Sequence, residues 1–320
     1  MLPLVLLVMW VFIVPKTITE IGNTENAFPL FLYAFQTVMH NKELMIGLSA
    51  LAVVIQALYL TYVINKQDVL REASHLPALM YVVLMSCFPE QLSFNPLLAA
   101  NFFIIMFLNS LFKFYRADSA SFHVFDAGLF IGIAGLFYWP ALFLFPLIWS
   151  ALVLLRPFNW KEWVVSLIGV ALPFIVLAVV LFWFGMLSEN KIAGILQPFY
   201  QMHLSAIYKS TYIILFVILA ALGVASLIKF FQDMSTFAKL RTRKFLVLFV
   251  WFFLFAAISY LVSVKRTMIS LSFLAIPLSV MFSNYFISLR RQLLAELIFL
   301  ILLAAVIYNQ VLYFLQFHPF

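Results

Sequence analysis

The sequence predicts an all-α fold, a polytopic membrane helix bundle with about eleven transmembrane helices and two short interfacial helices in outer loops. Of the 320 residues, 66% are hydrophobic and only 10% are charged, whereas a soluble domain carries roughly 25% charged residues. The charged residues also fall in short clusters between apolar stretches, most of them long enough to cross a bilayer. We therefore expect residues 1–320 to form one integral membrane domain.

The apolar stretches define the expected spans. In chain order they are 1–15, 44–64, 76–88, 96–112, 125–138, 140–155, 163–185, 211–228, 245–264, 269–288 and 293–315. At about 1.5 Å per helical residue, the first stretch is too short for a hydrocarbon core of about 30 Å. A stretch of this length is expected if it is the end of a longer helix. The break at Tyr138-Trp139-Pro140 is either a tight turn between two spans or a kink within one helix. The turn is favoured, because proline disfavours helix in the residue before it.

The basic residues predict an orientation. With Met1 in the cytoplasm and eleven spans, the inner loops hold thirteen of the nineteen lysines and arginines, and the outer loops hold six. Every inner loop is then basic, as the positive-inside rule requires. We expect a bacterial inner-membrane protein with a cytoplasmic N-terminus and a periplasmic C-terminus. The net charge of +7 follows from this bias and does not indicate nucleic acid.

Two outer loops show the apolar periodicity of a helix, which is typical of helices lying in the membrane interface. They are 16–43 and 186–210. The alternative is that both are plain connectors packed on the bundle. Within the fifth span, Gly128-x-x-x-Gly132 followed by Gly135 permits close contact between helices and indicates a packing role.

Motifs for nucleotide, zinc or serine-hydrolase chemistry are missing from the sequence, and its five histidines lie in separate loops without ligand spacing. We therefore expect no metal site and no cofactor. Cys87 is the only cysteine, which excludes an internal disulfide.

The candidate catalytic residues are three outer-side carboxylates, Glu20, Glu25 and Glu90, each suited to act as a general base. Asn95 and Asn101 follow Glu90, and their amides are candidates for binding a polar head group. The structural alternative is that Glu90 and Asn95 cap a turn while Asn101 bonds a neighbouring helix.

Lys265 and Arg266 form the second candidate group. They place two positive charges in a short outer connection, against the topogenic preference. Cations at a membrane rim suit phosphate or pyrophosphate, and His203 would add to the same basic surface. The alternative is ordinary snorkelling to lipid head groups. Merging the two helices around Tyr138 would move the pair to the cytoplasm.

The middle of the chain, roughly residues 85–185, carries a set of recognisable short motifs. They are Phe88-Pro89-Glu90, Asn95, Ala100-Asn101-Phe102-Phe103, Phe125-Asp126-Ala127, Ala134-Gly135-Leu136-Phe137-Tyr138, and Asn159-Trp160-x-x-Trp163 with Gly169. In these motifs the chain resembles an uncharacterised family of Bacteroidetes multi-pass inner-membrane proteins. The resemblance implies the fold and the membrane location but no activity.

In layout the chain also resembles the membrane-embedded C-type glycosyltransferases, which depend on polyprenol phosphate. That resemblance implies that Glu20 or Glu25 takes the place of the catalytic acid in the first outer loop. It also implies that Lys265 and Arg266 hold the lipid phosphate. The chain departs from those enzymes in lacking the acidic pair separated by one residue and a large outer domain.

These features predict a protein that handles a lipid-linked or amphipathic envelope substrate near its outer face, as a glycosyl or related transferase. Two alternatives remain open: a transporter or flippase without enzyme activity, and a structural subunit of an envelope complex. The expected partners are membrane lipids, a polyprenol-phosphate-linked substrate and other envelope proteins.

Overall fold

A computed structural model of the chain describes residues 42–88, 91, 95–115, 119–183, 212–236, 240–262, 268–289 and 291–317. Within these residues the regular structure is helical, which confirms the all-α prediction. The elements are α3 (Lys42–Lys66), α4 (Leu76–Met85), α5 (Pro96–Phe112), α6 (Ser121–Phe137), the 3-10 helix η4 (Trp139–Leu144), α7 (Pro146–Leu155), α8 (Trp160–Trp183), α10 (Ile213–Thr236), α11 (Leu240–Val262), the 3-10 helix η6 (Met268–Leu271), α12 (Ser272–Ser288) and α13 (Gln292–Phe317).

Five of the described helices are long and apolar enough to cross a membrane. Their spans are Gly47–Lys66, Trp160–Trp183, Ile213–Asp233, Leu240–Leu261 and Gln292–Val311. Five further apolar helices have 10 to 17 residues, fewer than the roughly 20 that a perpendicular crossing needs. The expected count of eleven transmembrane helices is therefore not supported.

Three of the predicted helices fall on residues that the structure does not describe. The span expected at 1–15 and the interfacial helix expected in 186–210 lie outside the described ranges. The interfacial helix expected in 16–43 also lies outside them, except for its last two residues, which begin α3.

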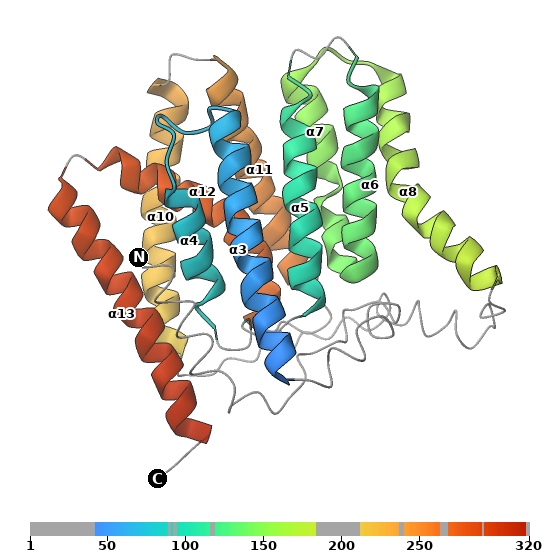
Figure 1. Cartoon of the computed structure of the whole chain (residues 1–320). Helices are drawn as coiled ribbons and strands as arrows, with labels where there is room; N and C mark the ends of the chain where they lie inside the picture. The colour runs from blue at the N-terminus through green and yellow to red at the C-terminus, as the bar shows by residue number, and fades with distance from the viewer. Residues whose placement is uncertain are drawn as a thin grey trace.

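Helix α12 lies at the centre of the bundle, where it contacts α4, α5, α10 and α11. Most of its side chains are buried, from Phe273 near its start to Phe286 near its end. Figure 1 shows α13 and α8 on the two flanks, with α13 beside α10 and α8 beside α6. A short apolar helix such as α4 is therefore surrounded by other helices rather than by lipid along most of its length.

The chain reverses direction at the break that the sequence indicates. Helix α6 ends at Phe137, and Tyr138 has extended backbone (φ −144°, ψ 103°) before η4 begins with Trp139 and Pro140. The amide of Tyr138 still donates to the carbonyl of Ala134, which closes the last turn of α6. The tight turn between two helices is therefore confirmed.

Glycines bring α6 and α8 into close contact. A Cβ atom built on Gly128 would lie 2.6 Å from the carbonyl oxygen of Ser166, and one built on Gly132 would lie 2.6 Å from that of Val170. Close approach of this kind needs small residues at the interface. The packing role predicted for Gly128 and Gly132 is confirmed. Pro173 lies within α8, whose second half diverges from the bundle in Figure 1.

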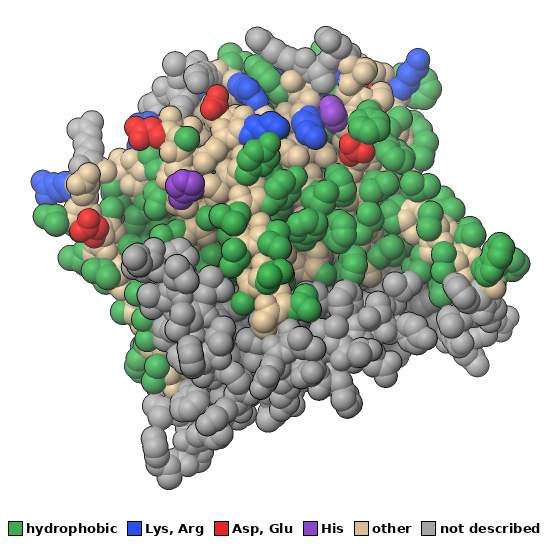
Figure 2. Space-filling view, viewed as in Figure 1, with side chains coloured by type: hydrophobic (Ala, Val, Ile, Leu, Met, Phe, Trp, Pro, Cys, Tyr) green, Lys and Arg blue, Asp and Glu red, His purple; other side chains and the backbone are tan. Residues whose placement is uncertain are grey.

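Among the described residues, charged side chains gather at one end of the bundle, the upper end in Figure 2. The connections α3–α4, α5–α6, α7–α8 and α10–α11 meet at this end in Figure 1. The basic residues in and beside these connections include Arg71, Lys113, Arg156, Lys161, Lys229 and Arg241. We call this end the basic end. All of these residues belong to loops that the sequence assigns to the cytoplasm.

Candidate functional site

Most of the predicted outer site lies outside the described residues. These positions are Glu20, Glu25, Glu90, His203, Lys265 and Arg266. Their roles as catalytic or binding residues stay predictions. Only the two asparagines, Asn95 and Asn101, have a described environment.

Asn95 caps the start of α5. Its Oδ1 accepts a hydrogen bond from the backbone amide of Leu98 at 2.8 Å, and Pro96 occupies the first helical position. This is the usual way to satisfy one of the free amides of a first helical turn. The side chain is buried, so the capping alternative describes its contacts.

Asn101 belongs to a buried polar network that joins four helices. Its Nδ2 donates to the backbone carbonyl of Ser272 on α12 at 3.4 Å. Nearby, the hydroxyl of Tyr81 on α4 donates to Oε1 of Gln56 on α3 at 2.7 Å, and Nε2 of Gln56 donates to the carbonyl of Leu98 on α5 at 2.8 Å. Asn101 therefore bonds a neighbouring helix, as the structural alternative expects. The two asparagines bond to different elements.

An apolar cavity of about 340 Å³ lies between the end of α4 and helices α10, α11 and α12. Its volume is within the range of small-molecule sites. Its lining residues are Leu84, Cys87, Phe88, Gln91, Phe216, Leu219, Ala220, Gly223, Val224, Leu227, Phe253, Leu271, Leu274, Ala275 and Leu278. Gln91 contributes the only side-chain amide in this set, so the walls suit a hydrocarbon chain.

The cavity extends along α10 from Phe216 to Leu227, a rise of roughly 16 Å at about 1.5 Å per residue. Most of this lining lies in the half of α10 that is farther from the basic end, because α10 runs toward that end from Ile213. Two candidate segments adjoin it in the sequence. Glu90 directly precedes Gln91, and Lys265-Arg266 precede Leu271 by a few residues.

Helix α13 is fastened to the end of α4 beside this cavity. Nδ2 of Asn309 donates to the carbonyl of Cys87, and Nε2 of Gln310 donates to the carbonyl of Ser86, each at 2.8 Å. The last carbonyls of a helix have no partner within it. The two amides supply donors for carbonyls in the turn after α4, so α13 acts as a side-chain cap for α4.

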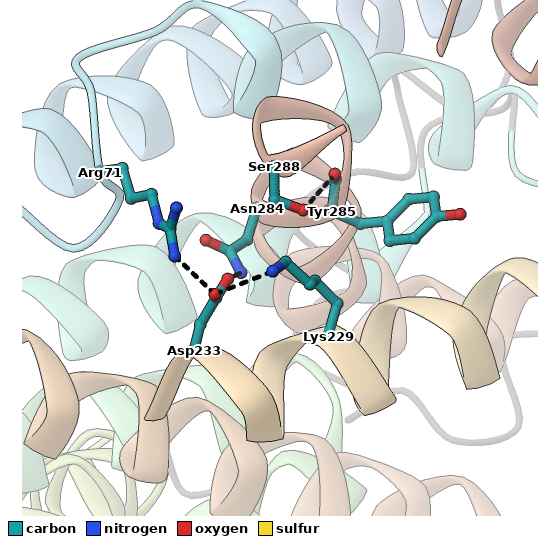
Figure 3. Close-up of polar contacts among 6 residues, drawn as sticks. All are labelled: Arg71, Lys229, Asp233, Asn284, Tyr285 and Ser288. Atoms are coloured by element: carbon teal, nitrogen blue, oxygen red, sulfur yellow. Dashed lines mark hydrogen bonds and ion pairs between the residues drawn. The ribbon is translucent and has the colours of Figure 1, made fainter. Parts of the chain in front are cut away.

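A second polar cluster, which we call the Asp233 junction, lies near the basic end (Figure 3). Oδ1 of Asp233 accepts from Nη2 of Arg71 at 2.8 Å and lies 3.2 Å from Nζ of Lys229. Nδ2 of Asn284 donates to Oδ2 at 2.8 Å. The carboxylate is fully buried, and the junction joins the α3–α4 connection to α10 and α12.

Two further contacts hold the same connection against α11. The guanidinium of Arg241 bonds Oε1 of Gln67, and the hydroxyl of Thr242 donates to the carbonyl of Asp68 at 3.1 Å. Asp68 has a left-handed backbone conformation (φ 51°), which aspartate tolerates better than most residues. The α3–α4 connection is thus held by side chains from both α10 and α11.

The sequence reasoning missed Asp233. Its signal was present, because Lys229 precedes it by four residues, the spacing of a helical ion pair. An acid near a helix C-terminus also opposes the helix dipole, and such a violation of a local preference often marks a functional or strained position. Arg71 and Asn284 gave no such signal, because they are distant in the sequence.

The groups that bind metal ions do not gather in the described part of the chain, where no three His, Cys, Asp or Glu side chains are close enough to hold one. Comparison with curated proteins and with solved structures found no match. A family model described as DUF6427, a family of unknown function, matches residues 26–318. The chain belongs to this family.

Proposed function

We propose that the protein handles a lipid-linked or amphipathic envelope molecule and that the cavity between α4, α10, α11 and α12 holds its apolar chain. The observation that carries the proposal is the lining of the cavity, which is apolar except for Gln91 and the thiol of Cys87. Such walls suit a hydrocarbon chain and offer few hydrogen bonds to a hydrophilic solute in transit. The lining therefore favours an amphiphile over a hydrophilic solute as the bound molecule.

Recognition of such a molecule depends on its polar part. A hydrocarbon chain that moves from lipid into the cavity gains little hydrophobic free energy, because lipid tails are as apolar as leucine side chains. Selectivity must then come from shape and from polar contacts near the cavity. Gln91 is positioned to supply one of them, and the proposed enzyme adds Glu90, Glu25 or Glu20 as base and Lys265 with Arg266 as phosphate ligands.

The cavity has free space beside Gly223. A Cβ atom on Gly223, which lines the cavity, would have nothing within 4 Å. Gly47 on α3 has the same open surroundings but lies away from the cavity. Gly223→Leu should therefore obstruct binding of the hydrocarbon chain, and Gly47→Leu is its matched control.

The test is photocrosslinking of the full chain in membranes with a diazirine-tagged prenyl phosphate. Wild type and Gly47→Leu should give labelled peptides from α10 and α12, and Gly223→Leu should lose most of this labelling. Equal labelling in all three proteins would refute the proposal that the cavity binds the hydrocarbon chain. For the enzyme form, Glu25→Gln or Glu90→Gln should abolish function at unchanged abundance, and full function in both variants would exclude it.

We further propose that the protein resides in a bacterial inner membrane with the basic end in the cytoplasm. The clustering of the described basic residues at one end supports this orientation. Because Cys87 is buried, a cysteine introduced elsewhere reports with little background. A membrane-impermeant maleimide should label Lys191→Cys, expected in an outer loop, and spare Glu72→Cys at the basic end until the inner membrane is opened. The reverse pattern would show the opposite orientation.

A further inference from the structure

The Asp233 junction presents two cations side by side. Nη2 of Arg71 and Nζ of Lys229 both lie within 3.2 Å of Oδ1 of Asp233, so the two nitrogens are close to each other. The side chain of Arg71 is 44% exposed and that of Lys229 is 27% exposed, whereas Asp233 is fully buried. The carboxylate is therefore the buried member of the cluster, and the two cations are its partly exposed members.

Asp233 fixes the positions of two long, flexible side chains. Its second oxygen is held by Nδ2 of Asn284, which is itself buried in the central helix. Figure 3 shows the carboxylate between Arg71, Lys229 and Asn284. A ligand that binds both cations loses little side-chain entropy when they are already arranged by other contacts.

We propose that Arg71 and Lys229 bind a phosphate group at the basic end, with Asp233 as the positioning residue. A phosphate offers several acceptor oxygens and can bridge a guanidinium and an ammonium at once. The three charged groups sum to one positive charge, so a dianion is attracted while a cation is not. Acidic neighbours, Asp68 and Glu72, lie in the same connection, so the geometry of the pair, rather than a diffuse basic field, must provide the binding.

This site is independent of the apolar cavity. Lys229 follows the cavity residue Leu227 by two positions, which places the two side chains about 160° apart around α10. The phosphate could belong to a lipid head group or to a free phosphate ester, since both present the same chemistry. Lys229 lies one turn before Asp233, the last residue of the apolar span of α10, and its side chain is partly exposed.

Two double variants separate geometry from charge. Arg71→Gln with Asp233→Asn, and Lys229→Gln with Asp233→Asn, each remove one cation and one anion. The net charge of the junction stays the same in both, and no buried carboxylate is left unpaired. Lys113→Gln, an exposed cation at the same end, is the control for a lost charge outside the junction.

Binding is measured on the full chain by two methods. Native mass spectrometry in nanodiscs with a small fraction of phosphatidic acid tests binding of a lipid head group. Phosphorus NMR in maltoside micelles with inorganic phosphate tests binding of a free phosphate. Wild type and Lys113→Gln should bind alike in at least one method. Both double variants should bind at least about tenfold more weakly there, as expected for a lost charge-assisted hydrogen bond.

The outcomes separate the possible sources. Binding of phosphatidic acid alone assigns the site to a lipid head group, and binding of inorganic phosphate alone assigns it to a free phosphate ester. Wild-type affinity in either folded double variant would overturn the proposal, because the two-cation geometry would then be unnecessary. The absence of binding by the wild type in both methods would overturn it as well.

Discussion

Gly128→Ala tests the close contact between α6 and α8. The added Cβ would lie 2.6 Å from the carbonyl oxygen of Ser166, 3.0 Å from the amide nitrogen of Val170 and 3.1 Å from Cα of Gly169. All three atoms belong to backbone, so no side chain can rotate away. Ordinary contact begins at 3.4 Å, and α8 must therefore retreat by several tenths of an ångström or more.

The expected destabilisation follows from this displacement. Overfilling a close-packed interface costs about 1–3 kcal/mol, whereas replacing glycine by alanine in a helix gains about 1 kcal/mol. Gly223→Ala has the same propensity gain without the collision, because nothing lies within 4 Å of its Cβ position. The difference between the two variants isolates the steric cost, and we expect Gly128→Ala to be less stable than Gly223→Ala by about 1–3 kcal/mol.

The assay is reversible unfolding of the purified protein in mixed micelles by increasing SDS, followed by tryptophan fluorescence. Trp149 on α7 and Trp163 on α8, whose ring centroids lie 5.3 Å apart, report on this region. Equal midpoints for Gly128→Ala and Gly223→Ala would refute the close contact. A loss in Gly47→Ala as large as that in Gly128→Ala would refute the steric explanation.

Two further predictions concern the helix ends. Asn309→Leu or Gln310→Leu should lower the free energy of unfolding by about 1–3 kcal/mol, because each removes the donor for a buried carbonyl. The same SDS titration measures this change, and wild-type stability in both variants would contradict the cap on α4. Asn95→Ala should lower the free energy of unfolding by about 1 kcal/mol, because it removes the helix cap. Asn95→Ser should retain most of the wild-type stability, and equal losses in the alanine and serine variants would contradict capping.

The sequence predicted helix positions well where local chemistry marks them. Asn95-Pro96 begins α5, and the Tyr138-Trp139-Pro140 break separates α6 from η4. Both signals are local, because a capping amide and a proline act on their own turn. The span count was not supported for a different reason. Hydropathy detects the apolar residues of α4 but cannot distinguish a helix buried among others from one that crosses the bilayer.

The sites were harder to predict because they depend on long-range contacts. The carboxylate of Asp233 meets Arg71 across 162 positions and Asn284 across 51, and no period in the sequence links such residues. The cavity is formed by gaps between α4, α10, α11 and α12. Its walls are ordinary apolar residues, so their sequence is typical of any membrane helix.

The basic residues of one end are not equivalent, although the positive-inside rule counts them alike. Arg71 and Lys229 contact a buried carboxylate, and Arg241 lies over the rings of Tyr115 and Phe245 at 5.8 and 5.4 Å. Lys113 is exposed. A carboxylate as buried as Asp233 would be strongly unfavourable without cations beside it, so this part of the basic end stabilises the junction of the α3–α4 connection with α10 and α12. The charge bias that orients the chain therefore also supplies the cations that this buried junction requires.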